Sequence, residues 1–230
     1  MTPVTRLRSH QHAHLILMLA LTFSTGVVDA VGFLGLDRVF VGNMTGNVVI
    51  LGMAMVGADD LPVLGPALAL IGFMVGAAGA GRALRRKSPG SWAVSTTVVL
   101  TVVGLVVLGT ALLVLFDEAM PHAVTLGVTT LLGTAMGMQA AAARMIAVKD
   151  VTTVVVTSSI TGLAADSWFG ANNPGGSGRR IAAVLVLLLG AALGALSLLV
   201  SLSLGLFISA AVILAVAAFG AVPAAEDADR

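Results

Sequence analysis

The sequence predicts an all-α polytopic membrane protein with six transmembrane helices and two broken segments. Of its 230 residues, 58% are hydrophobic and only 10% are charged, too few charges for the surface of a soluble domain. Six segments are apolar over the roughly 20 residues that a helix needs to cross a bilayer. Two more apolar segments are interrupted by glycine and polar residues, and such backbone survives at membrane depth only inside protein or beside a cavity.

The six predicted spans leave room for one domain only. They cover residues 14–36, 61–84, 93–116, 123–145, 181–200 and 204–222. The last two form one apolar run that is too long for a single span, so we divide it at residues 201–203. We expect a leader at 1–13, a transmembrane domain at 14–222 with repeat halves at about 14–116 and 123–222, and a tail at 223–230. No small-residue cleavage pattern follows the first span, which is therefore expected to remain uncleaved.

The two broken segments, 37–56 and 151–168, have a common pattern. Each begins with β-branched or aromatic residues, Val39-Phe-Val41 in the first and Val154-Val-Val156 in the second. A polar motif follows, Phe40-Val-Gly-Asn-Met-Thr-Gly-Asn47 or Thr157-Ser-Ser-Ile-Thr-Gly162. We expect each segment to be an extended piece, a turn and a short helix that starts near the pair Thr45-Gly46 or Thr161-Gly162.

The positive charges indicate that the broken segments are re-entrant, entering and leaving the membrane on one side. With six full spans, eleven of the twelve lysines and arginines lie in the cytoplasm together with both termini, and only Arg38 lies outside. With eight full spans, the better orientation still leaves five of them outside. The tendency of cytoplasmic loops to carry Lys and Arg favours the model with six spans and two re-entrant segments.

An internal repeat is predicted from matched positions in the two halves. Thr45-Gly46 matches Thr161-Gly162, and Gly76-Ala-Ala78 matches Gly190-Ala-Ala192 at almost the same spacing. Asp29-Ala30 stands where Gln139-Ala140 stands in the second half. Three full spans in each half would give the halves opposite orientations, which defines an inverted-topology repeat. Recurrence of Gly-Ala pairs by chance in apolar helices is the alternative.

Two stretches resemble a known family. The first is Asp29-Ala-Val-Gly-Phe33 with Val39-Phe-Val-Gly-Asn-Met-Thr-Gly-Asn47, and the second is Gly137-Met-Gln-Ala140 with Thr152-Thr-Val-Val-Val-Thr-Ser-Ser-Ile-Thr-Gly162. Both are similar to signatures of the YoaK-type family of bacterial integral membrane proteins of unknown function. The resemblance covers most of the chain. It implies six membrane spans, and it brings no assigned substrate and no catalytic residues.

Asp29 is the one acidic residue well inside the first predicted span. A carboxylate at the centre of a membrane helix costs about 2.5–3.5 kcal/mol on insertion scales and normally has a partner or a function. One interpretation is a residue that couples proton or cation movement to transport. The other is a structural aspartate that holds the neighbouring polar motif in place.

The two polar motifs supply the other candidate site residues. In the first, Asn43, Thr45, Gly46 and Asn47 stand where a half-helix would begin, and its free N–H groups and positive dipole end suit an anionic ligand. Capping of that helix by Asn43 or Thr45 is the plainer alternative. In the second, Ser158, Ser159, Thr161 and Gly162 would form the matching helix start, although Ser and Thr also bond to backbone within membrane helices. Gln139 is either the counterpart of Asp29 or a contact between helices.

Other chemistry finds little support in the sequence. There is no cysteine, no phosphate-binding Gly-Lys-Ser/Thr loop, no HExxH pair and no GxSxG motif. We therefore expect no enzyme activity, no cofactor and no nucleic-acid partner. The alternating His10, His12 and His14 suit a solvated leader better than a metal site.

These observations lead to one functional hypothesis and one rival. The hypothesis is a secondary transporter or facilitator of a small solute, with an anion favoured by the helix starts, whose site lies at the membrane midplane between the two broken helices. Membrane lipids and the solute are the expected partners, and a homo-oligomer is compatible with the sequence. The rival is a membrane scaffold or assembly partner in which the polar motifs only satisfy each other.

Overall fold

Eight α-helices make up the described part of the computed structural model, which covers residues 3–58, 60–86, 90, 92–116, 120–146, 156–172 and 175–228, with the backbone alone described for residues 3–11 and 222–228. The helices are α1 (Pro3–Gly35), α2 (Met44–Ala54), α3 (Leu64–Leu84), α4 (Val94–Phe116), α5 (His122–Ile146), α6 (Val156–Ala165), α7 (Ser177–Ser197) and α8 (Leu202–Ala228). No strand occurs in these ranges.

Six of the helices are long and apolar enough to cross a membrane, which confirms the predicted number of spans. Each contains an 18-residue stretch whose mean hydropathy lies between 1.2 and 2.9. α2 and α6, which form parts of the two broken segments, have 11 and 10 residues and are too short to span. The chain is therefore a multi-pass membrane protein. The predicted break near residue 201 is confirmed, since α7 ends at Ser197 and α8 begins at Leu202.

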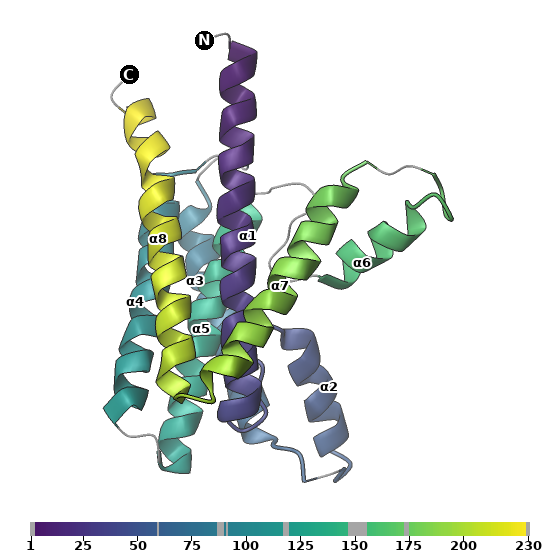
Figure 1. Ribbon diagram of the computed structural model, residues 1–230. Coiled ribbons are helices and arrows are strands. Elements are labelled where there is room, and N and C mark those ends of the chain that lie inside the picture. The colour runs from purple at the N-terminus through teal and green to yellow at the C-terminus, as the bar shows by residue number, and fades with distance from the viewer. Residues whose placement is uncertain are drawn as a thin grey trace.

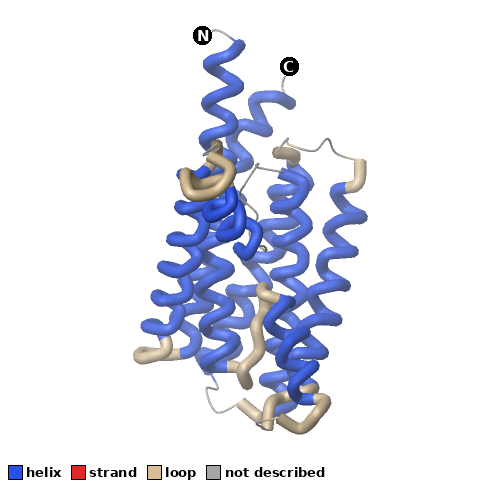
Figure 2. The backbone as a smooth tube through the Cα atoms, turned by 90° about the vertical axis from the view of Figure 1, so that its right-hand side faces the viewer, coloured by secondary structure: helices blue, strands red, loops and turns tan. Residues whose placement is uncertain are grey.

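The long helices run up and down one bundle (Figure 1). α1 begins and α8 ends at the upper end in this view, where α3 also ends and α4 begins, while α4 ends and α5 begins at the lower end. α2 begins part-way up the bundle and returns to the lower end, where α1 had finished. α6 lies on the same side of the molecule near the upper end, from which α7 descends. Figure 2 shows the loop before α2 running up beside the helices.

Glycines let the main helix pairs approach closely. α3 packs against α5, α1 against α7 and α4 against α8, while α1 also contacts α8 and α4 also contacts α5. A Cβ atom at Gly76 would collide with the backbone oxygen of Thr134 on α5, and one at Gly190 would collide with that of Phe23 on α1. Close approach of backbones through small residues is how membrane helices gain packing energy, because lipid supplies no hydrophobic drive.

Several hydroxyl side chains inside the bundle form hydrogen bonds within it. The hydroxyls of Ser24 on α1 and Ser209 on α8 lie 2.7 Å apart, and both residues are fully buried. The Thr22 and Thr110 hydroxyls donate to backbone oxygens four residues earlier in their own helices. Such bonds remove the cost of a bare hydroxyl in an apolar interior.

The structure differs from two sequence predictions. Thr161 and Gly162 lie in the second half of α6, so the prediction that this helix starts near them is wrong. Ser and Thr can occupy an early helical turn as well as a turn before it, and the sequence did not separate the two. The first helix also begins earlier than the predicted span at 14–36, because α1 extends back to Pro3. A helix continues cheaply once nucleated, and no glycine interrupts residues 4–14.

Several predicted features lie outside the described residues. They include the extended piece at Val154 and Val155, and the loop charges at Asp59, Lys87, Asp117, Glu118, Lys149 and Arg230.

Candidate functional site

The site is built around the loop that joins α1 to α2. At Asp37 and Arg38 the backbone adopts positive φ angles of 61° and 55°. Two consecutive left-handed residues reverse the chain direction, so that it runs back along α1 instead of leaving the bundle. Val39 and Val41 then anchor the loop, since both side chains are fully buried.

The Asp29 carboxylate on α1 holds the end of this loop. Its Oδ1 accepts three hydrogen bonds from consecutive backbone N–H groups, at 2.9 Å from Val41, 2.7 Å from Gly42 and 3.3 Å from Asn43. Gly42 makes this approach possible, because a Cβ atom there would come within 2.9 Å of the Thr25 methyl. A run of N–H groups converging on one oxygen is a typical anion-binding arrangement, and here the anion is part of the protein.

Asn47 fixes the beginning of the same loop. Its side-chain Oδ1 accepts from the Phe40 N–H at 2.9 Å, and its Nδ2 donates to the Phe40 carbonyl at 2.5 Å. The Asn47 side chain is fully buried and pairs with Phe40 as a neighbouring strand would. This predicted site residue is therefore occupied by the loop itself.

Asn43 caps α2, as the plainer alternative for it proposed. Its Oδ1 accepts from the Gly46 N–H at 3.4 Å. The start of α2 thus lies at Met44, beside Thr45, and the helix start predicted near Thr45-Gly46 is confirmed. Gly46 leaves space for the Phe40 ring, which a Cβ atom would meet at 2.6 Å.

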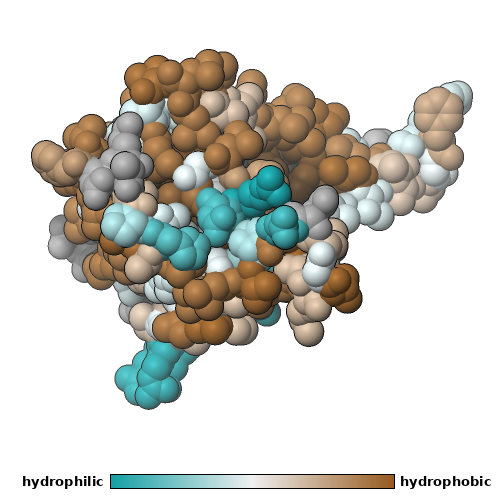
Figure 3. Space-filling model, turned by 90° about the horizontal axis from the view of Figure 1, so that it is seen from below, coloured by the Kyte–Doolittle hydropathy of each residue, from teal (hydrophilic) through white to brown (hydrophobic). Residues whose placement is uncertain are grey.

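A cavity of about 580 Å³ lies against this loop. α1 contributes Thr25, Asp29 and Phe33 to its wall, and the loop and the start of α2 contribute a second group of residues, namely Phe40, Gly42, Asn43, Thr45, Gly46, Val49 and Ile50. The remaining wall comes from the start of α6 and from α7, through Val156, Thr157 and Leu187. Both short helices therefore begin at the same cavity. Seen from the lower end, hydrophilic side chains gather at the centre of that face and hydrophobic ones surround them (Figure 3).

Among the described residues that line this cavity, Asp29 alone carries a charge. Among the described residues no Lys, Arg or His forms an ion pair with it, and no hydrogen bond reaches its Oδ2. The carboxylate is half-buried. One oxygen is thus held by the loop, and the other remains for a further partner.

The second polar motif contributes less to the cavity than expected. Thr157 lines it, whereas Ser158, Ser159, Thr161 and Gly162 do not. Gly162 instead faces the Arg180 guanidinium of α7, which a Cβ atom would meet at 2.7 Å.

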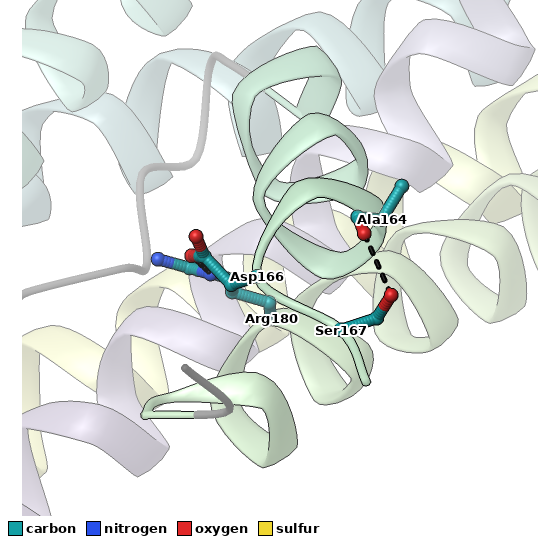
Figure 4. A network of polar contacts seen from close by, with 4 residues as sticks. All are labelled: Ala164, Asp166, Ser167 and Arg180. Atoms are coloured by element: carbon teal, nitrogen blue, oxygen red, sulfur yellow. Dashed lines mark hydrogen bonds and ion pairs between the residues drawn. The ribbon is translucent and has the colours of Figure 1, made fainter. Parts of the chain in front are cut away.

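An ion pair links the end of α6 to α7. Arg180 donates to the Asp166 carboxylate at 2.5 Å, and the Ser167 hydroxyl caps the helix end by donating to the Ala164 carbonyl at 2.7 Å (Figure 4). The ion pair joins the residue just after α6 to α7, whereas the cavity-lining residues Val156 and Thr157 lie at the start of α6.

Gln139 contacts Thr25, one of the residues that line the cavity. This fully buried α5 residue donates from Nε2 to the Thr25 hydroxyl at 3.1 Å and to the Leu21 carbonyl at 3.4 Å. Its Oε1 is buried and has no partner among the described residues. Gln139 therefore joins α5 to α1 beside Asp29, as the interhelical-contact interpretation predicted.

Comparison with known proteins identifies the family. A family described as "Protein of unknown function (DUF1275)" matches residues 17–219, which is most of the chain. The chain belongs to the DUF1275 family. It is also 29% identical over 150 residues to the "UPF0700 transmembrane protein YoaK" of Bacillus subtilis (strain 168), a match that covers 65% of each chain. No solved structure matches it.

The resemblance noted in the sequence is therefore confirmed, and the fold gives its residues a physical meaning in this DUF1275 protein. Asp29 holds the loop, Gly42 permits the approach, Asn43 caps α2 and Asn47 pairs with Phe40. The residues Asn43-Met-Thr-Gly-Asn47 thus stabilise a loop that is followed by the short helix α2.

Three aromatic and hydroxyl residues of the DUF1275 cavity were missed by sequence reasoning. Thr25 and Phe33 lie four residues before and after Asp29, so they share its face of α1. That spacing was a usable signal. Phe40 belongs to the predicted extended piece and polar motif but was not among the predicted site residues, yet its ring stacks on Phe33 with the centroids 4.7 Å apart.

No metal site is evident in the described portion of this DUF1275 chain, where no three potential ligands gather. His14 instead lies beside Trp92, with ring centroids 6.0 Å apart.

Proposed function

We propose that this protein is a secondary transporter or facilitator of a small solute, and that the solute binds in the cavity beside Asp29. One observation carries the proposal: the two short helices, from opposite halves of the chain, both begin at a cavity that contains an unpaired carboxylate. A structural core would be expected to fill such a space with side chains. Half-helices that meet at a midplane cavity are the usual architecture of a transporter site.

In this proposal α2 and α6 are re-entrant and the two halves form an inverted repeat. If α1, α2, α3 and α4 are exchanged with α5, α6, α7 and α8 in that order, each pair of helices in contact is replaced by a pair that is also in contact. The α3–α5 pair becomes α7–α1, α1–α8 becomes α5–α4, and α2–α3 becomes α6–α7. The α4–α8 and α1–α5 pairs map onto themselves. A chance recurrence of Gly-Ala pairs gives no reason for this correspondence.

The glycine contacts support the same exchange residue by residue. Gly76 approaches Thr134, and Gly190 approaches Phe23; Gly137 approaches Phe73, and Gly26 approaches Leu187. The distance along the sequence from Gly26 to Gly137 equals the distance from Phe23 to Thr134. The distance along the sequence from Gly76 to Gly190 likewise equals the distance from Phe73 to Leu187. This register pairs Asp29 with Ala140, the neighbour of Gln139.

The polar groups around Asp29 argue against an anionic solute. The loop N–H groups that would bind an anion already donate to Asp29, and the Gly46 N–H donates to the Asn43 side chain. An anion would also meet the charge of Asp29. We therefore drop the preference for an anion that the helix starts suggested.

A change in protonation of Asp29 during the cycle is part of the proposal. No other titratable group in the described part of the chain lines the cavity. On the helices packed against α1, the titratable residues whose side chains the structure describes are His122 and Arg144 of α5 and Arg179 and Arg180 of α7, all near helix ends.

The orientation and setting follow the positive charges. Both termini face the cytoplasm across a bacterial inner membrane, lipids surround the bundle, and no enzymatic step is involved. A homo-oligomer is compatible with this arrangement. Reconstituted into proteoliposomes, the protein should allow flux of small cationic or neutral solutes, and Asp29→Asn should change the pH dependence of that flux.

A scaffold without transport is the second candidate, because Asn43 and Asn47 are satisfied by the loop itself. If no solute in a panel of cations, anions and neutral compounds crosses proteoliposomes faster than across protein-free ones, the scaffold is favoured.

A further inference from the structure

We infer that the solute is a small organic cation, held between the Asp29 carboxylate and the rings of Phe33 and Phe40. This inference rests on the proposed transport function and names the class of solute for the same cavity.

The charge of the cavity is the first argument. Asp29, the one charged residue among the described ones that line it, is acidic, and none of the described basic residues pairs with it. Three N–H groups end on Oδ1, which leaves Oδ2 on the same carboxylate without a hydrogen bond from the described residues. An ammonium group in the cavity would supply a counter-charge, which stabilises the charged form of this half-buried carboxylate.

The aromatic wall is the second argument. Phe33 of α1 and Phe40 of the loop both line the cavity, and their rings stack with 4.7 Å between centroids and 23° between planes. A cation is attracted to the face of an aromatic ring within about 6 Å of its centroid. A hydrated metal ion makes little use of such a wall, whereas an alkylated ammonium uses both the rings and the carboxylate.

The polar motif fixes the position of the Phe40 ring. Asn47 holds the Phe40 backbone by two hydrogen bonds. Gly46 provides the space beside the Phe40 ring. The loop therefore presents one ring and the N–H groups that orient Asp29 at the same time.

The size and remaining polarity agree with an organic molecule. A volume of about 580 Å³ lies within the usual range of small-molecule sites. The hydroxyls of Thr25, Thr45 and Thr157 are spread around the wall, where they can bond to ammonium N–H or to a hydroxyl on the solute.

The test measures binding to the purified full-length protein by isothermal titration calorimetry. The probes are benzyltrimethylammonium, tetraethylammonium and methylammonium as cations, phenylacetate as an anion and benzyl alcohol as a neutral compound. At least one cation should bind, and phenylacetate should not. Asp29→Asn should lower the affinity for that cation at least about tenfold, and Phe40→Leu should lower it about 2- to 30-fold.

Asp60→Asn is the matched control. Asp60 is exposed, lies outside the cavity and has a positive φ angle that Asn tolerates. This variant should bind as the wild type does. Gel filtration and thermal melting establish that each variant is folded, and a variant that does not fold is replaced by Asp29→Glu or Phe33→Leu.

Three results would overturn the inference: tighter binding of phenylacetate than of every cation, unchanged cation affinity in folded Asp29→Asn, or no binding of any cation. Flux of the same probes separates this failure from failure of the proposed function. If phenylacetate or benzyl alcohol crosses proteoliposomes in a protein-dependent manner, transport stands and the cation assignment falls. If no probe binds or crosses, both fall.

Discussion

The backbone N–H of Gly42 donates a 2.7 Å hydrogen bond to the Asp29 Oδ1, and this contact joins the first transmembrane helix to the loop that starts α2. The same oxygen accepts from Val41 and Asn43. One carboxylate in α1 thus organises three consecutive residues of the broken segment and faces the cavity as well. The two interpretations of Asp29, structural and functional, concern different oxygens of one side chain.

Substitutions at Asp29 should separate these two roles. Asp29→Asn retains an oxygen for the loop N–H groups, so the protein should remain folded while any pH-dependent flux becomes pH-independent. Asp29→Ala leaves buried donors unsatisfied at about 1–3 kcal/mol for such a group, so it should also lower the melting temperature. Flux at several pH values and thermal unfolding in detergent measure the two effects. Wild-type pH dependence in Asp29→Asn would show that the residue is structural only.

Asn47 should matter more for stability than Asn43. Asn47→Ala removes both hydrogen bonds to Phe40 from a fully buried position, and we expect a loss of about 1–3 kcal/mol. Asn43→Ala removes one long capping bond at an exposed position, where the cost is typically about 1 kcal/mol. Chemical denaturation of the two variants in the same detergent compares them. An equal or larger loss for Asn43→Ala would contradict the role assigned to Asn47.

Equivalent glycines of the two halves should respond alike to a methyl group. Gly76→Ala and Gly190→Ala each force a Cβ atom into a facing backbone, so both should lower stability, by about 1–3 kcal/mol as overpacking does. Gly79→Ala is the control, because a Cβ atom there meets nothing within 4 Å. This control should be neutral or slightly stabilising, since Ala favours the helix. Destabilisation by only one of the two equivalent glycines would weaken the repeat.

Single cysteines test the proposed re-entrant segments, and the native chain contains no cysteine to interfere. Met55→Cys, just after α2, should react on intact cells with a membrane-impermeant maleimide. Ala171→Cys, between α6 and α7, should react only after the cells are opened. Both positions are exposed, so access to the reagent depends on the side of the membrane. Labelling of Ala171→Cys on intact cells would contradict the six-span topology.

Much of the fold could be predicted because membrane spans follow directly from length and hydropathy. The start of α2 was also predictable, since Asn43 and Gly46 carry a recognisable capping pattern. The start of α6 was not, because Ser and Thr satisfy backbone groups equally well before a helix and inside it. In the site, Asp29 was conspicuous as a charge in an apolar span. Phe33 and Phe40 were not, because aromatic residues in such a span usually face lipid or core, and only the turn at Asp37 and Arg38 brings their rings together.

The central proposal, that solute passes through the cavity beside Asp29, is tested most directly by blocking that cavity in a transporting protein. Thr45→Cys places a thiol on the cavity wall, and Met55→Cys places one outside it. Both variants are reconstituted in proteoliposomes, and flux of benzyltrimethylammonium is measured before and after a bulky methanethiosulfonate reagent, and again after reduction. The proposal predicts that the reagent abolishes flux through Thr45→Cys, that reduction restores it, and that Met55→Cys is unaffected. Undiminished flux through fully modified Thr45→Cys would contradict it.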